Sequence, residues 1–167
     1  MSVSGVVKVR RDGVITLTDG AAASYTVAYE DGDFSADKLT GVNAADRVVI
    51  RDRGTIVGVR KGDDPVGSLS FTVHLRELTN STAAVLLDFI TGTQGTGAGA
   101  VALVSSGGIG FEQFMLDCKM TIDGQDLTDS TATFSKVLFT ADMSEGDPDK
   151  LSLKGEVYGS VVYTGQA

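Results

Sequence analysis

The sequence contains no tryptophan and only one cysteine, one histidine and two prolines among its 167 residues. A single cysteine excludes an internal disulfide, and the first residues, Met1 to Ser4, lack the basic and long apolar regions of a secretion signal. We therefore expect synthesis and folding in a reducing cytoplasm. Without tryptophan, and with aromatic residues at 7%, the chain also lacks the aromatic platforms that carbohydrate-binding sites usually present.

The composition favours β-structure in a single domain, residues 1–167. The chain has 21 glycines and is rich in valine, threonine and serine, which is typical of many strands and turns. Apolar residues at 42% and charged residues at 22% are ordinary for a globular protein, and they indicate neither general disorder nor a membrane protein. The net charge of −8 repels phosphate, so tight nucleic-acid binding is not expected.

Alternating apolar and polar residues predict the strands. The clearest alternation places Leu69, Phe71 and Val73 on one face of a strand that runs to Leu75. Further strands are expected over residues 6–10, 14–18, 25–29, 114–122, 133–141 and 151–163. The first two would form a hairpin, and the last is unusually long. Gly155 and Gly159 would let that last strand bend as it passes from one sheet to another.

One amphipathic helix is expected over residues 80–90. Ala83, Leu86, Leu87 and Ile90 recur there with the period of one helical face. The first turn is expected to be capped by one of Thr79, Asn80 and Ser81, and Gly92 suits the C-terminal end. The predicted fold is therefore mainly β: two packed antiparallel sheets, as a β-sandwich or partial barrel, with one flanking α-helix.

Two segments lack the hydrophobic pattern of an element that is buried within a single chain. A projecting hairpin at about 43–66 carries the apolar runs 48–50 and 56–59 with apolar residues on both faces, which indicates that both faces are covered, for example by another subunit. Residues of about 92–110 are rich in glycine and poor in large side chains, so we expect a mobile loop there. Both segments are expected to become ordered on contact with a partner.

No catalytic, cofactor or metal site is indicated. His74 lies on the polar side of its strand, and Cys118 lies in the apolar register of its strand with no second cysteine nearby. Residues 92–97 superficially suggest a phosphate-binding loop, but they follow a helix and lack lysine. The carboxylates at 30–33 and 142–149 lack the spacing of a calcium loop. The chain is therefore expected not to be an enzyme and to need no cofactor or metal.

The order of several segments resembles the major tail tube proteins of long non-contractile (siphovirus-type) phage tails, across nearly the whole chain. No single segment is diagnostic, and the similarity depends on their order and spacing. The segments that carry it are Gly13 to Gly20, Tyr29 to Asp33, Gly62 to Val73, Leu87 to Gly92 and Thr140 to Pro148.

This resemblance implies a structural protein of the virion tail, made in the host cytoplasm. Six copies would close into a hexameric ring whose inner strands form one continuous barrel, and the rings would stack into the tail tube that conducts the genome during ejection. Ring closure would remove exposed strand edges. DNA would pass through the lumen without specific binding, no membrane would be involved, and the partners would be other copies and tail proteins such as the tape measure, tail tip and terminator proteins.

Several alternatives stay open at this point. The chain could be a tube protein of a contractile injection or secretion system, or a tail-completion protein with the same fold. A third alternative is a surface-binding or carbohydrate-binding β-sandwich, which the low aromatic content disfavours.

The distribution of charge suggests how the rings would stack. Residues 47–61 contain five of the 14 basic residues and one acidic residue, so the hairpin carries about +4 and the rest of the chain about −12. We hypothesise that the hairpin contacts an acidic face of the next ring. The alternative is a solvated hairpin whose arginines keep an apolar edge soluble. The hypothesis pairs Arg47, Arg51, Arg53, Arg60 and Lys61 with Asp142, Glu145, Asp147 and Asp149.

Overall fold

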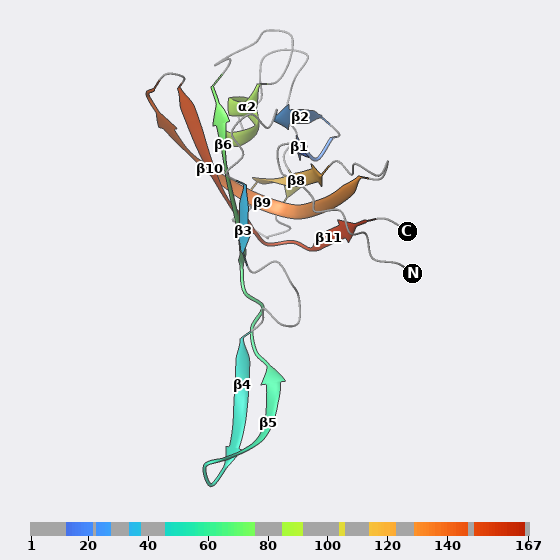
Figure 1. Ribbon diagram of the computed structural model, residues 1–167, viewed down its shortest axis with the longest axis vertical. Helices are drawn as coiled ribbons and strands as arrows, with labels where there is room; N and C mark the ends of the chain where they lie inside the picture. The colour runs from blue at the N-terminus through green and yellow to red at the C-terminus, as the bar shows by residue number, and fades with distance from the viewer. Residues whose placement is uncertain are drawn as a thin grey trace.

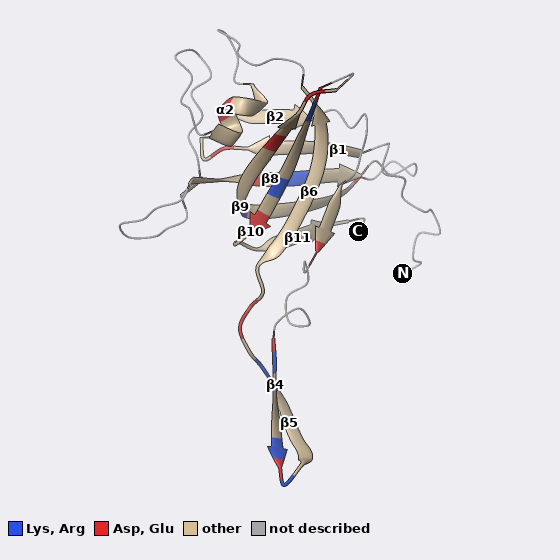
Figure 2. Cartoon of the chain, turned by 90° about the vertical axis from the view of Figure 1, so that its left-hand side faces the viewer, with Lys and Arg blue, Asp and Glu red and all other residues tan. Residues whose placement is uncertain are grey.

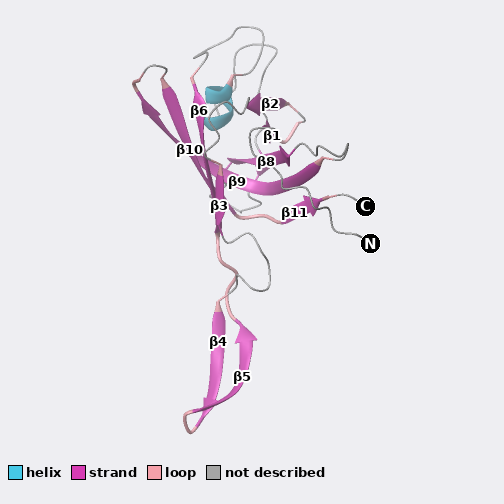
Figure 3. Ribbon diagram, in the orientation of Figure 1, coloured by secondary structure: helices cyan, strands magenta, loops and turns pink. Residues whose placement is uncertain are grey.

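The computed structural model describes residues 13–21, 23–27, 34–37, 46–75, 85–91, 104–105, 114–122, 129–146 and 149–165. Within these residues the chain is mainly β-structure with one short helix, as Figure 1 and Figure 3 show. The helix is α2 (Leu86–Thr91). The strands are β1 (Gly13–Thr18), β2 (Ser24–Val27), β3 (Ser35–Asp37), β4 (Arg47–Asp52), β5 (Thr55–Lys61), β6 (Gly67–His74), β7 (Val104–Ser105), β8 (Phe114–Ile122), β9 (Ser130–Ser144), β10 (Lys150–Val157) and β11 (Val161–Thr164).

The strands form one large antiparallel sheet and one separate hairpin. The large sheet has nine strands in the order β2-β1-β8-β9-β10-β6-β3, with β11 also paired to β9 and β7 to β8. Strands β4 and β5 pair only with each other. The predicted class, antiparallel β-structure with a flanking helix, is confirmed.

Strand β9 connects the two halves of the large sheet. Its first part, residues 130–137, pairs with β8 and β11, whereas its last part, residues 137–144, pairs with β10. In Figure 1 the half made of β10, β6 and β3 stands at a steep angle to the half made of β1, β8 and β11, and α2 lies in the angle between them. The predicted pair of packed sheets is thus one sheet that bends at β9 around a common core.

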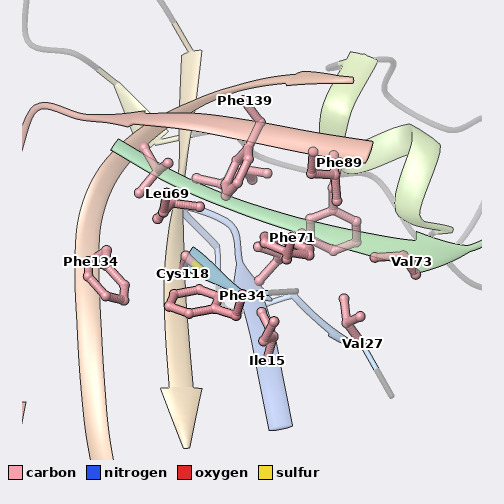
Figure 4. Packing of buried hydrophobic residues seen from close by; sticks show 14 of the residues in the cluster. Ile15, Val27, Phe34, Leu69, Phe71, Val73, Phe89, Cys118, Phe134 and Phe139 are labelled. Atoms are coloured by element: carbon pink, nitrogen blue, oxygen red, sulfur yellow. The ribbon is translucent and has the colours of Figure 1, made fainter. Parts of the chain in front are cut away.

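The core is formed by apolar side chains from both halves. Phe34, Phe71, Phe134 and Phe139 make successive ring contacts, with centroid distances of 6.1 Å for Phe34–Phe134, 6.4 Å for Phe34–Phe71 and 6.0 Å for Phe71–Phe139. Figure 4 shows these rings in one core together with Cys118, which is fully buried. Aromatic pairs at such distances stabilise the core beyond their buried area, so this row of rings joins the two halves of the sheet.

The helix α2 is shorter than the predicted segment 80–90, of which residues 80–84 lie outside the described residues. The helix begins after Val85, whose backbone N–H donates to Asp88 Oδ2 at 3.0 Å, so Asp88 supplies the cap. The proposed caps at 79–81 also lie outside the described part. Leu86 and Phe89 are buried, and Leu87 and Ile90 pack against the core. The predicted apolar face is therefore correct at Leu86, Leu87 and Ile90, and it also includes Phe89.

Most predicted strands are present, with one correction. Strands β6, β8 and β9 occupy the predicted segments, whereas the proposed strand at 6–10 lies outside the described residues. The predicted single strand over 151–163 is wrong, because β10 ends at Val157 and β11 begins at Val161. Between them the chain passes from one half of the sheet to the other at Gly159, the position where the sequence indicated a bend. None of the described helical residues forms a segment that is long and apolar enough to cross a membrane.

Candidate functional site

The hairpin β4–β5 is built around a tight turn. Arg53 and Gly54 connect the strands and have φ values of 46° and 89°, as a type I′ turn requires at both central positions. Arg51 Nη1 donates to the carbonyl oxygen of Gly54 at 3.2 Å, which holds the turn from one side. Two arginines of the predicted contact set therefore also shape the tip.

The base of the hairpin is closed by the backbone. Asp46 N–H donates to Asp63 O at 2.9 Å, and Gly62 N–H donates to Asp46 O at 2.5 Å. A Cβ atom at Gly62 would lie 2.9 Å from Asp46 O, so this close approach needs glycine. Lys61 Nζ pairs with Asp64 Oδ1 at 2.5 Å. The two ends of the hairpin are thus fixed side by side where they leave the body of the protein.

Beyond this base the two strands of the hairpin form backbone pairs only with each other within the described residues. Figure 1 shows β4 and β5 extending away from the large sheet along the long axis of the molecule. The apolar side chains of both strands are exposed, from 41% at Val48 to 66% at Val57. An isolated two-stranded ribbon is only marginally stable in water, and large exposed apolar surfaces mark interaction sites. The hairpin therefore has the properties of a docking arm.

The structure does not bring the predicted basic and acidic residues together within one chain. Figure 2 shows the basic tip of the hairpin at one end of the long axis and acidic residues where β9 and β10 join at the other end. Asp142, Glu145 and Asp149 are exposed at that far end, and Asp147 lies outside the described residues. Asp142 Oδ2 is 3.3 Å from Lys154 Nζ, and Asp149 Oδ1 accepts the Gly146 N–H at 2.9 Å.

The other candidate groups do not form a reactive site. His74 ends β6 in one half of the sheet, and Cys118 lies in β8 in the other half. Burial raises the pKa of the Cys118 thiol to about 12, and the neighbouring Asp117 carboxylate adds to this, so the reactive thiolate is disfavoured. Among the described residues, no cluster of His, Cys, Asp or Glu side chains is arranged to hold a metal ion.

A hollow of about 460 Å³ lies over the half-sheet of β3, β6, β9 and β10. Its lining includes the hydroxyl groups of Ser68, Ser70 and Thr140 together with Lys154 and Glu156. No aromatic side chain lines it, so the hollow lacks the stacking surface that sugar-binding sites usually present.

One exposed residue at the acidic end escaped the sequence prediction. Met143 lies in the apolar register of β9, two residues beyond the end of the strand predicted at 133–141. In the structure Met143 is 57% exposed, because β9 continues past the core at Phe139. Nothing in the local sequence indicates where the core ends, and only the packing of the sheet reveals it.

No protein-family model and no curated protein matches the chain. Solved structures do match. The chain is similar to a chain of the PVC sheath/tube terminator of an extracellular contractile injection system, with a TM-score of 0.58 and 13% identity over 98% of this chain and 99% of that chain. A chain of the PVC sheath-tube complex matches with a TM-score of 0.57 and 12% identity, over 98% of this chain and 95% of that one. The anti-feeding prophage tube-terminating cap gives a TM-score of 0.57 at 12% identity, over 99% and 95%.

These matches span almost the whole of both chains and establish a fold shared with components of tail-like assemblies. They come from contractile injection systems. They therefore agree better with the alternative of a protein from a contractile injection system than with a siphovirus-type tail tube.

Proposed function

We propose that the chain is a structural subunit, without catalytic activity, of the tube or tube end of a contractile injection system. The observation that carries this proposal is the β4–β5 hairpin, which is exposed on both faces and projects from a sheet with the fold of such assemblies. A monomer would leave this apolar ribbon in water. An assembly of copies would cover it.

The proposed assembly consists of rings that stack head to tail. The ends of the molecule are chemically different, with a basic arm at one end and exposed carboxylates at the other. Different and complementary faces are what an open, repeating polymer needs. The proposal includes a hexameric ring and a lumen that conducts cargo or DNA without specific binding. It also includes contacts with terminator, tip or tape measure proteins. A phage virion with a non-contractile tail is its second form, supported by the sequence resemblance.

The inter-ring contact is proposed between the basic hairpin residues and Asp142, Glu145, Asp147 and Asp149. Each exposed ion pair would contribute only about 0.2–1 kcal/mol, but a ring repeats every pair once per subunit. Electrostatic attraction would orient the incoming ring, and burial of the apolar hairpin surface would supply most of the stability.

Electron microscopy and sedimentation of the concentrated, purified protein test the proposal. We expect rings or tubes from the wild-type chain. A variant with residues 47–61 replaced by a short Gly-Ser linker should remain monomeric with an unchanged melting temperature, because Asp46 and Gly62 already lie in hydrogen-bonding contact. A wild-type protein that remains monomeric at every concentration, or that binds glycans as a stable monomer, would overturn the proposal.

Charge reversal tests the electrostatic part. The double variant Arg51→Glu, Arg53→Glu should block tube growth, and Asp149→Lys should restore growth in that background. Both arginines also shape the turn, so the neutral variant Arg53→Asn is the matched control, because asparagine tolerates positive φ. Normal tubes from the double variant would eliminate the ion-pair model.

A further inference from the structure

The two faces of the hairpin differ in chemistry. Residues directly opposite each other in an antiparallel pair point to the same face, so the register Arg47↔Lys61, Val49↔Val59 and Arg51↔Ile56 defines one face. We call this the basic face. The pairs Val48↔Arg60, Ile50↔Gly58 and Asp52↔Thr55 define the opposite face, which we call the glycine face.

Charge separates the two faces completely. The basic face holds three cationic residues and no acidic one, and of these Lys61 at the base is already paired with Asp64. On the glycine face Arg60 and Asp52 cancel formally. The remaining positive charge of the hairpin, Arg53, lies at the tip. All of the excess positive charge of the strands is therefore on one face.

The basic face also presents more apolar surface. Val49, Ile56 and Val59 are 43%, 56% and 59% exposed, and Val57, the extra residue at the β-bulge, is 66% exposed. The glycine face has only Val48 and Ile50 as large apolar side chains, and a Cβ atom at Gly58 would meet nothing within 4 Å. The basic face would thus gain more from burial than the glycine face.

The opposite end of the molecule carries the matching chemistry. Met143 is exposed on the core-facing side of β9 beyond the last buried side chain, Phe139, and the exposed residues Glu145 and Asp149 lie in the connection that follows. Asp142, the neighbour of Met143 in β9, points to the opposite face, where its carboxylate is 3.3 Å from Lys154 Nζ. An exposed apolar side chain next to an acidic connection is complementary to an apolar strand face that also carries cations. The same chain therefore supplies both surfaces, at opposite ends of its long axis.

We propose that the basic face of the hairpin docks on the Met143 end of a second copy, while the glycine face does not contact that end. This proposal rests on the proposed function and specifies the surface that performs the stacking. The second copy is favoured over nucleic acid or anionic lipid because the chain outside the hairpin carries about −12, which attracts the arm of another copy and repels anionic partners.

Paired threonine variants test the assignment of the faces. Val49→Thr with Val59→Thr alters the basic face, and Val48→Thr with Ile50→Thr is the matched control on the glycine face, since threonine keeps the branched shape that suits a strand. The basic-face variant should raise the protein concentration needed for assembly about tenfold or more, and the control should change it little. Equal effects of the two variants would overturn the face assignment and leave the proposed function intact. A wild-type chain that never assembles would overturn the function itself.

Disulfide trapping gives an independent readout. Val59→Cys combined with Met143→Cys should form intermolecular disulfide-linked ladders when assembled protein is oxidised with copper phenanthroline, whereas Val48→Cys with Met143→Cys should not. The native Cys118 is fully buried and would not interfere. Ladders from the Val48→Cys pair alone would contradict the proposal. The proposal would also be contradicted if the monomer bound phosphatidylglycerol vesicles through the basic face and if assembly did not depend on that face.

Discussion

The backbone N–H of Lys136 donates to Asp117 Oδ1 at 2.9 Å, at the place where β9 passes from one half of the sheet to the other. Lys136 has a φ of 53°, and the register between β8 and β9 shifts beside Asp117. Two residues of β9 thus oppose one residue of β8, which is a β-bulge. The side chain of Asp117 replaces the strand partner that the bulge removes.

Removal of this carboxylate should therefore destabilise the fold. Asp117→Ala leaves the part-buried Lys136 N–H without its acceptor, and we expect a loss of about 1–3 kcal/mol in the free energy of unfolding. Asp117→Asn keeps an acceptor oxygen and should lose less. Urea denaturation of both variants provides the measurement, and equal stability of Asp117→Ala and the wild type would show that the bulge does not depend on this bond.

Gly159 should be intolerant of a side chain. Its N–H donates to Ser135 O at 3.0 Å, and a Cβ atom would lie 2.4 Å from that same oxygen. Because the oxygen belongs to the backbone of the bulge, we expect Gly159→Ala to cost about 1–3 kcal/mol. Gly165→Ala is the control, since a Cβ atom there meets nothing within 4 Å. Thermal melting of the two variants should differ clearly, and equal melting temperatures would refute the close approach.

Cys118 should make stability depend on alkaline pH. Its pKa is raised from 9.0 to about 12, first by burial and second by Asp117. Above about pH 9 the unfolded chain loses the thiol proton while the folded chain keeps it, so stability falls toward pH 12 by at most about 1.4 kcal/mol per pH unit from this group. Cys118→Ala should have a smaller slope over this range. Identical slopes would show that the thiol does not contribute.

The same burial should protect the thiol from chemical modification. In native protein at pH 8, Cys118 should not react with Ellman's reagent, and it should react fully after denaturation in guanidinium. Rapid reaction in the native state would contradict the buried position.

Hydrogen exchange should distinguish the hairpin from the sheet. Amides of β4 and β5 have only each other as partners and should exchange much faster in the monomer than amides of β9 and β10, which lie inside the large sheet. On assembly the hairpin amides should become protected. Strong protection in the monomer that does not change in the polymer would contradict a docking arm.

The sequence determined the local elements and the unusual charge of the hairpin. Alternation predicted β6 and β8, the apolar period predicted the buried face of α2, and the apolar runs 48–50 and 56–59 predicted a hairpin, because these signals depend only on neighbouring residues. The five basic residues of the hairpin were also visible directly.

Only the tertiary structure decided how the elements combine. Pairing between β9 and its partners involves residues far apart in the chain, so the bulge at Lys136 and the bend between the two half-sheets have no local signal, whereas Gly159 marked a bend without showing that the strand ends there. The exposure of Met143 depends on where the core ends, and the two faces of the hairpin depend on strand register. A register shift of one residue would exchange the faces without any change in the sequence pattern, which is why the docking surface required the folded structure.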